Sequence, residues 1–413
     1  MKHASEPQAQ EPDARLIAGL TGYIRGLLSD DHRPELYRQY EEALGQVDPQ
    51  VVFTVFRQLQ ADGVATERLL DVLPKVINVV HAALEGSRIP PIPEHSFIAY
   101  LDQENQALLE RLDQLRGLIR EAAADPENQT IFAQMAASVD DMAPYLVHFN
   151  KKENILFPYL EQHHERYEGV SIMWALHDQA RDLLRQTAPR LRDPAVGRAD
   201  QFRRIGELFF VLHGLVQKER LILFPSALTR LTPDQHRQML QQSTEYEWAF
   251  INEPSFDPAH PDEAQPAGRY PAGSEDWVFQ TETGHLSFSQ LEQLFDTIPV
   301  DMTLIDADNH VCFFNRARDR IFPRSPAIIG RRVEFCHPPQ SVDKVMAIVE
   351  AFRSGQENKA SFWLRLSGRF ILIQYFALRG RDGLYQGTLE VSQDITEIRQ
   401  LDGEQRLLDW RQD

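Results

Sequence analysis

Two similar stretches decide the fold of the central part of the chain: residues 148–158 (HFNKKENILFP) and residues 213–225 (HGLVQKERLILFP). Each contains a histidine, charged residues and a closing Leu-Phe-Pro within an apolar pattern of helical spacing. Working outward from them, the same spacing predicts four long helices, at about residues 94–124, 128–165, 170–188 and 198–229. Because the breaks between them are short, we expect an up-down-up-down four-helix bundle over residues 94–245.

Other structure is expected on both sides of this bundle. Residues 1–15 are predicted to be a disordered tail and residues 16–86 a small all-helical domain, in which Asp48 caps a helix that begins at Pro49. Residues 252–284 are rich in Pro, Gly, Asp and Glu and are predicted to be a linker.

A strand-rich pattern comes after the linker. Turn signals occur at Asp308-Asn309 and Asp382-Gly383. The strand-like runs between and around them are residues 302–305, 311–314, 361–366, 370–377 and 388–391. They predict an α+β domain with an antiparallel sheet over residues 287–400, followed by a helix at residues 401–413. The predicted fold class is therefore multidomain, with all-α parts first and an α+β domain last.

Composition excludes several classes of protein. The 413 residues include 43 Lys and Arg against 61 Asp and Glu, a net charge of -18, which disfavours binding to nucleic acid. With two cysteines, Cys312 and Cys336, neither a disulfide scaffold nor a four-thiolate zinc site is expected. Since the sequence shows neither a signal peptide nor a long apolar run, no transmembrane segment is predicted and a cytoplasmic location is expected, with peripheral attachment to a membrane left open.

The two opening stretches, with residues 173–178 (MWALHD), Glu94-His95 and Glu104-Asn105, resemble the hemerythrin-like (HHE cation-binding) domain. The resemblance implies a bundle that holds a non-haem iron pair through histidines and carboxylates. The usual family signature on the second and fourth helices is H-x-x-x-E followed by Leu-Phe-Pro. Here Lys152 stands four residues after His148, and Gln217 four residues after His213. Residues four apart share one helix face, so a carboxylate is missing from the implied site.

The resemblance implies a set of metal ligands: His95, His148, His177 and Glu219, with Glu153 or His213 as further candidates. Imidazole with carboxylate suits iron, manganese or zinc, and iron, mononuclear or dinuclear, is the metal expected. Two alternatives stay open at this point. One is a haem held by two histidines, and the other is a bundle that keeps the scaffold without a metal.

Residues 300–306, 308–315, 329–331 and 387–396 resemble a PAS domain. From Leu16 onward the chain also resembles an uncharacterised bacterial family, in which a helical domain of unknown function precedes the hemerythrin-like bundle and the PAS domain. In the segment expected to face the PAS cavity stand Cys336 and His337. Either could bind a cofactor as an axial haem ligand, and Cys336 could act as a redox-sensing thiol; the cavity could also hold a small ligand. The structural alternative is that the prolines after them end one element and begin the next.

Three functions remain open from sequence. The first is a sensory or regulatory protein whose bundle binds a metal and whose PAS domain senses or transmits a redox, oxygen or nitric oxide signal. The second is repair of iron centres, or iron and oxygen handling, under nitrosative or oxidative stress; the third is a metal-free interaction module. No Ser-His-Asp set, phosphate loop or dinucleotide fingerprint is present, so no catalytic residue is predicted. We expect a homodimer, through helices at residues 286–297 and 398–410, and a downstream protein partner.

Overall fold

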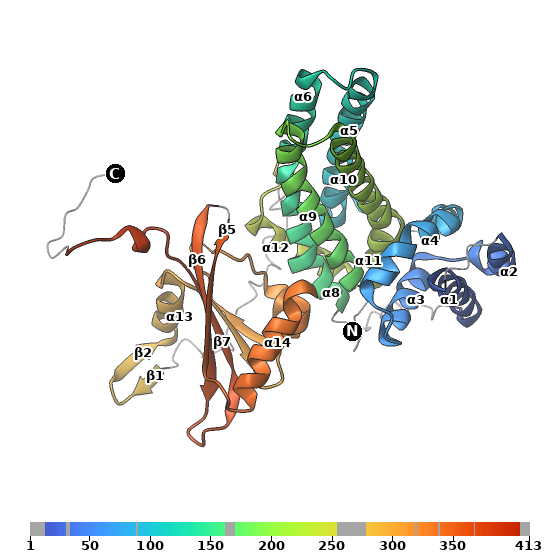
Figure 1. Ribbon diagram of the computed structural model, residues 1–413. Helices are drawn as coiled ribbons and strands as arrows, with labels where there is room; N and C mark the ends of the chain where they lie inside the picture. Colours follow the sequence, from blue (N-terminus) through green and yellow to red (C-terminus); the bar gives the residue numbers. More distant parts are fainter. Residues whose placement is uncertain are drawn as a thin grey trace. The chain divides into compact units, whose positions relative to one another are not determined.

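The computed structural model describes residues 13–29, 34–87, 90–161, 170–253, 278–318, 320–337, 339–366 and 368–404. The chain divides into two compact units, residues 1–257 and residues 258–413 (Figure 1). The first unit contains both the N-terminal helices and the bundle, which were predicted from the sequence as two separate domains. They pack together through apolar side chains around a cavity of about 50 Å³, whose lining includes Phe56, Leu73, Ile172 and Leu223.

Four helices form the N-terminal part of the first unit. They are α1 (Ala14–Leu28), α2 (Pro34–Leu44), α3 (Pro49–Ala61) and α4 (Thr66–Gly86). As predicted, Asp48 caps α3: its side chain accepts a hydrogen bond from the Val51 N–H at 2.8 Å. The predicted tail lies outside the described residues, except that α1 already begins at Ala14.

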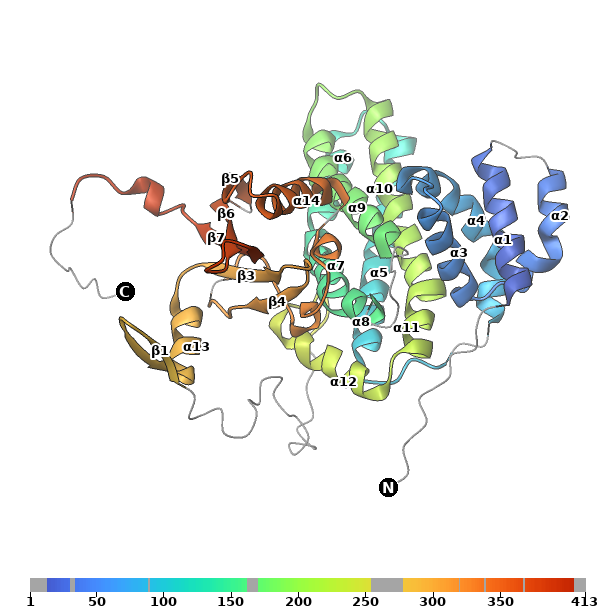
Figure 2. The same ribbon diagram turned by 90° about the horizontal axis from the view of Figure 1, so that it is seen from below.

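The bundle consists of four long helical rods, as predicted (Figure 2). The first is α5 (Phe97–Ala124) and the third is α9 (Val170–Arg192). The second rod runs through α6 (Gln129–Asp140), η1 (Ala143–Tyr145), α7 (Leu146–Lys151), η2 (Lys152–Leu156) and α8 (Phe157–Glu161). The fourth runs through α10 (Arg198–Lys218), η3 (Glu219–Leu223) and α11 (Phe224–Arg230). A short helix, α12 (Pro233–Gln242), and the turn η4 (Ser243–Glu245) come next.

The second and fourth rods each contain one stretch of π-helix, η2 and η3, placed immediately before a Phe-Pro pair. The N–H groups of Phe157 and Phe224 donate to carbonyls five residues earlier, those of Lys152 and Glu219. Pro158 and Pro225 have no backbone N–H. In both rods the proline therefore cannot donate the usual helical hydrogen bond to the carbonyl oxygen four residues earlier. A wider turn is therefore present in both, and spacing rules for a uniform helix do not carry across it.

The second unit is built on an antiparallel sheet in the order β4-β3-β7-β6-β5. Its strands are β3 (Asp301–Asp306), β4 (Val311–Phe314), β5 (Lys359–Leu366), β6 (Arg369–Arg379) and β7 (Tyr385–Asp394), which confirms all five predicted runs. The predicted turns are present, with Asn309 and Gly383 at positive φ angles of 70° and 78°. Before the sheet come a hairpin of β1 (Val278–Thr281) and β2 (Gly284–Ser287), within and just after the predicted linker, and α13 (Phe288–Thr297).

Helix α14 (Pro339–Arg353) covers one face of this sheet, where Val345, Val349 and Phe352 are buried. The short 3-10 helices η6 (Pro326–Ile328) and η7 (Val333–Cys336) lie in the chain between β4 and α14. After β7 the chain forms one 3-10 turn, η8 (Ile398–Gln400). Residues 401–404 are not helical, and the rest of the predicted C-terminal helix lies outside the described residues.

A candidate functional site in the helical bundle

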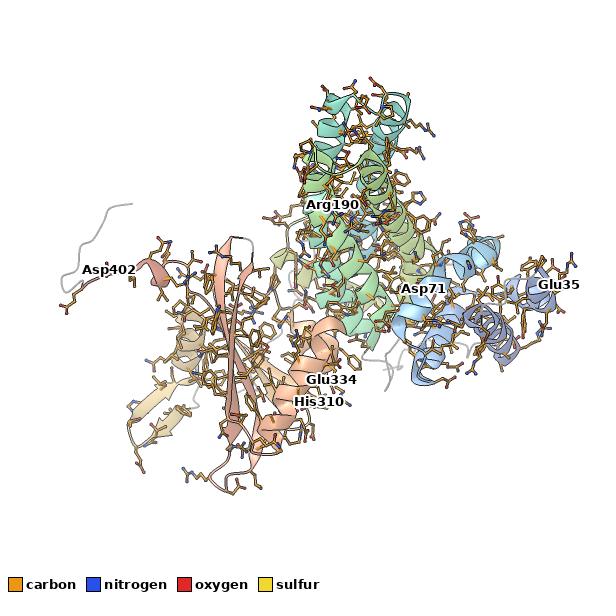
Figure 3. The ribbon with its side chains drawn as sticks, in the orientation of Figure 1. Glu35, Asp71, Arg190, His310, Glu334 and Asp402 are labelled. Carbon is orange, nitrogen blue, oxygen red and sulfur yellow. The ribbon has the colours of Figure 1, made fainter. Side chains whose placement is uncertain are left out.

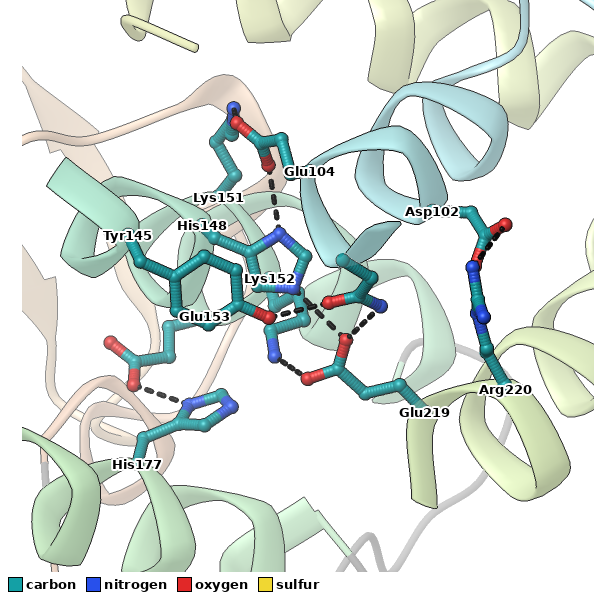
Figure 4. A network of polar contacts seen from close by, with 11 residues as sticks. Asp102, Glu104, Tyr145, His148, Lys151, Lys152, Glu153, His177, Glu219 and Arg220 are labelled. Atoms are coloured by element: carbon teal, nitrogen blue, oxygen red, sulfur yellow. Dashed lines mark hydrogen bonds and ion pairs between the residues drawn. The ribbon is translucent and has the colours of Figure 1, made fainter. Parts of the chain in front are cut away.

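Most charged side chains of the chain lie on its outside, as Glu35, Asp71 and Arg190 do (Figure 3). The bundle interior departs from this rule. Charged side chains from α5, the second rod, α9 and the fourth rod meet inside it and contact one another (Figure 4). Since burying a charge is unfavourable unless it is paired, the partners of each group decide what this site can do.

His148 links two buried glutamates at the centre of the site. Its Nδ1 lies 2.8 Å from Glu104 Oε2, and its Nε2 lies 2.9 Å from Glu219 Oε2. All three side chains are fully buried. A carboxylate only accepts hydrogen bonds, so both ring nitrogens donate and His148 is an imidazolium between two carboxylates.

Two consecutive lysines point into the same site. Lys151 Nζ donates to Glu104 Oε1 at 2.5 Å, and Lys152 Nζ donates to Glu219 Oε1. Both lysine side chains are fully buried. Burial lowers the pKa of Lys151 to about 8, although Glu104 acts in the opposite direction. Burial would raise the pKa of Glu219, but Lys152 and His148 outweigh it and hold that pKa at about 2.

A second cluster lies beside the first. His177 Nδ1 is 2.7 Å from Glu153 Oε1, while Arg181 donates to Glu153 Oε2 at 2.6 Å. The His177 ring is stacked between Phe149 and Phe157, at centroid distances of 4.5 and 5.8 Å. Burial and the nearby cations lower the pKa of His177 well below its usual value, so its neutral ring donates through Nδ1. Its Nε2 is buried and has no hydrogen-bond partner among the described residues.

Neutral groups complete the site. Asn105 donates to Glu219 Oε2 at 2.9 Å and accepts from the Tyr145 hydroxyl at 2.5 Å. On the other side, the Ala249 N–H donates to Glu104 Oε1 at 2.6 Å, and Lys151 Nζ lies 3.4 Å from the ring centre of Trp248. The segment after η4 therefore closes this end of the bundle over the buried charges.

The donor set of the bundle does not fit an iron pair. Each carboxylate oxygen of Glu104, Glu219 and Glu153 already accepts a hydrogen bond from a cation or an imidazole. Within the ranges that the structure describes, no group of three His, Cys, Asp or Glu side chains is arranged to hold a metal ion. A metal could bind the bare Nε2 of His177, but Lys152, Arg181 and His148 place positive charge nearby, and the oxygens of Glu153 are already paired.

The structure brings together four of the six residues that the resemblance implies as ligands: His148, Glu219, His177 and Glu153. His95 lies outside the bundle core, before α5, where it is exposed and contacts the Tyr100 hydroxyl at 3.1 Å. His213 is half-buried and stacks on Phe209. Neither histidine joins the site.

Sequence reasoning missed Glu104 as a site residue, and it missed Lys151, Trp248 and Ala249. The signal for Glu104 was present, since Glu104-Asn105 is a polar pair on the first helix of the bundle. No sequence signal points to Ala249, because it contributes through its backbone N–H and comes after the last bundle helix.

The two predicted cofactor residues of the second unit, Cys336 and His337, both line an interior cavity of about 20 Å³. Its wall also carries Arg324, Tyr375 and Glu390, with apolar side chains from β3, β4 and α14. The Nε of Arg324 is buried and has no hydrogen-bond partner in the part of the chain that the structure describes. Enclosure, with the charges of Arg324 and Arg331, lowers the pKa of His337 to about 4.

A haem does not fit this cavity, because a volume of about 20 Å³ holds roughly one or two water molecules. The Cys336 thiol donates to the Arg332 carbonyl oxygen at 3.6 Å, which is a structural contact. The cavity can therefore take a ligand of only a few non-hydrogen atoms.

Comparison with known proteins finds a family match within each unit. A family model of the hemerythrin HHE cation-binding domain matches residues 96–227, and a model of the PAS domain matches residues 291–396. The chain thus carries a hemerythrin HHE domain followed by a PAS domain, and this combination suggests a sensory or regulatory protein. No curated protein matches the chain.

Solved structures similar to part of this chain include three bacterial domains. A C-terminal domain from Streptococcus mutans is 32% identical and covers 31% of this chain and 99% of its own, with a TM-score of 0.30. The PAS domain of a protein from Colwellia psychrerythraea is 18% identical; the match covers 26% of this chain and 97% of that domain, with a TM-score of 0.23. A sensory box sensor histidine kinase from Vibrio cholerae is 13% identical; the match covers 26% of this chain and 89% of the solved chain, with a TM-score of 0.21.

None of the helices within the described ranges has both the length and the apolar character needed to cross a membrane.

Proposed function

We propose that the chain is a regulatory protein whose PAS domain binds a small polar solute in the cavity beside Arg324. The observation that supports this most strongly is the buried Nε of Arg324, which has no hydrogen-bond partner among the described residues. Buried polar groups are almost always paired, and an exception next to a cavity marks a place where a ligand or a water completes the pairing. The neutral ring of His337 and the Tyr375 side chain line the same space.

The ligand's chemistry can be inferred from this lining. A guanidinium calls for an acceptor, and a small carboxylate supplies one with a matching charge. The volume of about 20 Å³ restricts the ligand to a few non-hydrogen atoms. Glu390 also lines the cavity and disfavours a second negative charge, so the solute should carry no more than one.

Hydrogen–deuterium exchange of the full chain with formate, and with formamide as a neutral counterpart, tests this function. Formate should protect peptides of β3, β7 and α14, and formamide should protect them less. Arg324→Gln should abolish the protection, whereas Arg365→Gln, on the edge strand β5, should retain it. Absence of protection in the unaltered chain, or equal protection in the Arg324→Gln variant, would contradict the proposal.

A metal-dependent form of this function is a second candidate, in which iron in the bundle supplies a redox, oxygen or nitric oxide signal. Two observations favour it: the match to a cation-binding domain, and the bare Nε2 of His177. Against it stands the pairing of every glutamate oxygen in the site. Metal analysis and an absorption spectrum of protein purified without added metal distinguish the two candidates, because only the second requires bound iron.

We further propose that the protein acts as a cytoplasmic homodimer that signals to a protein partner. The support is α13, an amphipathic helix in which no residue is buried within the described part of the chain, with Leu294 43% exposed. Light scattering of the full chain and of Leu294→Glu tests the dimer. A dimer that persists in the variant, or a monomer in the unaltered chain, would exclude pairing through α13.

A further inference from the structure

We infer that the bundle carries its own cations: the ammonium groups of Lys151 and Lys152 take the role that a bound metal would have at Glu104 and Glu219. This inference concerns the bundle alone and does not depend on the ligand proposed for the PAS domain. It rests on where these two ammonium groups lie and on the charges that face them.

The two glutamates have oppositely charged neighbours in a repeated arrangement. Glu104 is held by Lys151 on Oε1 and by His148 on Oε2, and Glu219 is held by Lys152 on Oε1 and by His148 on Oε2. His148 therefore bridges two lysine–glutamate pairs (Figure 4). A divalent ion between the same carboxylates would supply the two positive charges that the two lysines supply here.

The paired charges around His148 and His177 balance without a metal. Among the described residues, this network contains the carboxylates of Glu104, Glu153, Asp178 and Glu219 and the cations His148, Lys151, Lys152 and Arg181. An added divalent ion would leave two uncompensated positive charges in a buried site, which is strongly unfavourable. The network thus excludes a metal by charge as well as by occupying the oxygen atoms.

The placement of Lys152 has a local cause. Lys152 stands four residues after His148, so both side chains leave the same face of the second rod and reach the same carboxylate, Glu219. Lys152 and Glu219 also begin the two π-helical stretches, η2 and η3. The ion pair thus joins equivalent points of the two rods, as expected of an element that fixes their register.

Lys218 provides an internal contrast. It precedes Glu219 directly, lines the apolar cavity between the N-terminal helices and the bundle, and its Nζ donates to the Gly214 carbonyl oxygen at 3.0 Å. Lys218 therefore lies on the same rod as Glu219 but donates no hydrogen bond to Glu104, Glu153 or Glu219 in the described contacts. Removing it should not create a binding place for a cation.

The test uses tag-free, full-length protein in four forms: unaltered, Lys151→Met/Lys152→Met, Lys218→Met and His148→Ala. Each is incubated without oxygen with Fe(II), and separately with Zn(II), then desalted and assayed for metal content and thermal unfolding. The unaltered chain and Lys218→Met should retain no metal above background. The double variant, in which Glu104 and Glu219 each lose their lysine partner, should retain metal, and its unfolding midpoint should rise with metal concentration.

The outcomes decide the inference in either direction. If the double variant is unfolded without metal, Fe(II) or Zn(II) should restore its helical circular dichroism. A double variant that neither binds metal nor refolds with it would overturn the inference. So would stoichiometric metal in the unaltered chain that is lost in His148→Ala.

Discussion

The carboxylates of the bundle and the guanidinium of Arg324 in the PAS domain are buried in different ways. In the bundle, the carboxylate oxygens of Glu104, Glu153 and Glu219 are all paired with cationic or imidazole groups of the same chain. In the PAS domain, Arg324 keeps a buried Nε without a partner among the described residues, beside a cavity.

We propose that this difference separates a structural site from a binding site. Paired carboxylates add specificity to the packing of the helices and leave no free oxygen for a ligand, whereas an unpaired buried group gains a partner when a ligand binds. A family match alone would assign the binding role to the bundle, whereas the function proposed here assigns it to the PAS cavity.

Glu219→Gln is expected to have the largest effect, because it removes the carboxylate that holds both Lys152 and His148. Breaking one partner of a buried charge pair lowers the free energy of unfolding by about 3–5 kcal/mol. Chemical denaturation followed by circular dichroism measures the loss. Glu42→Gln, which breaks only an exposed pair with Arg15 at 3.2 Å, is the control and should change little. An equally small loss in Glu219→Gln would show that the network does not stabilise the bundle.

His337 should make the stability of the PAS domain depend on pH. Its pKa is about 4 when folded, against 6.5 for the free side chain, so the unfolded chain binds the extra proton more readily between these values. Stability should therefore be highest above pH 6.5 and fall by up to about 3 kcal/mol as the pH drops through this range, with the loss complete only below pH 4.

Hydrogen exchange of PAS peptides across this pH range, corrected for intrinsic rates, provides the measurement. His337→Gln should flatten the profile between pH 4 and 6.5. A profile that is unchanged in the variant would mean that other groups cause the dependence.

Two matched tyrosines sharpen the comparison further. Tyr145→Phe removes a hydroxyl that donates to Asn105 at 2.5 Å inside the paired network, and should destabilise the bundle by about 0.5–1.5 kcal/mol. Tyr375→Phe alters the wall of the PAS cavity and should change stability less. Denaturation curves of both variants give the order of the two effects, and the reverse order would contradict the proposed contrast.

The smallest effect is expected at Cys336. Cys336→Ser should change PAS stability by less than about 1 kcal/mol, because the hydrogen bond from the thiol to the Arg332 carbonyl oxygen is weak. Added haem should produce no Soret band shift in either form, since the cavity is far too small. A shifted band that depends on Cys336 or His337 would instead place a haem in this domain.

The sequence predicts the fold well because its signals there are local. Five strands are expected from alternating apolar runs, and Asn309 and Gly383 stand where turns need positive φ. The four rods of the bundle are expected from helical spacing. The packing of the N-terminal helices onto the bundle is not predicted, since it depends on which apolar faces meet in three dimensions.

The site is predicted only in part, for a physical reason. The rule that residues four apart share a face links His148 to Lys152, and both do reach Glu219. The π-helical turn that begins at Lys152 changes the direction of the side chains within and after it, so Glu153 meets His177 on the neighbouring helix. Spacing rules for a uniform helix do not predict that turn. A search for His, Asp and Glu ligands also leaves out the lysines, which pair with the glutamates where a metal would bind.

Anomalous diffraction from crystals of the full chain grown with Zn(II) tests the central claim most directly. We predict no anomalous peak between Glu104, His148 and Glu219, with density for the Lys152 ammonium in contact with Glu219. A strong peak at that place, with the Lys152 side chain turned away from Glu219, would contradict the account.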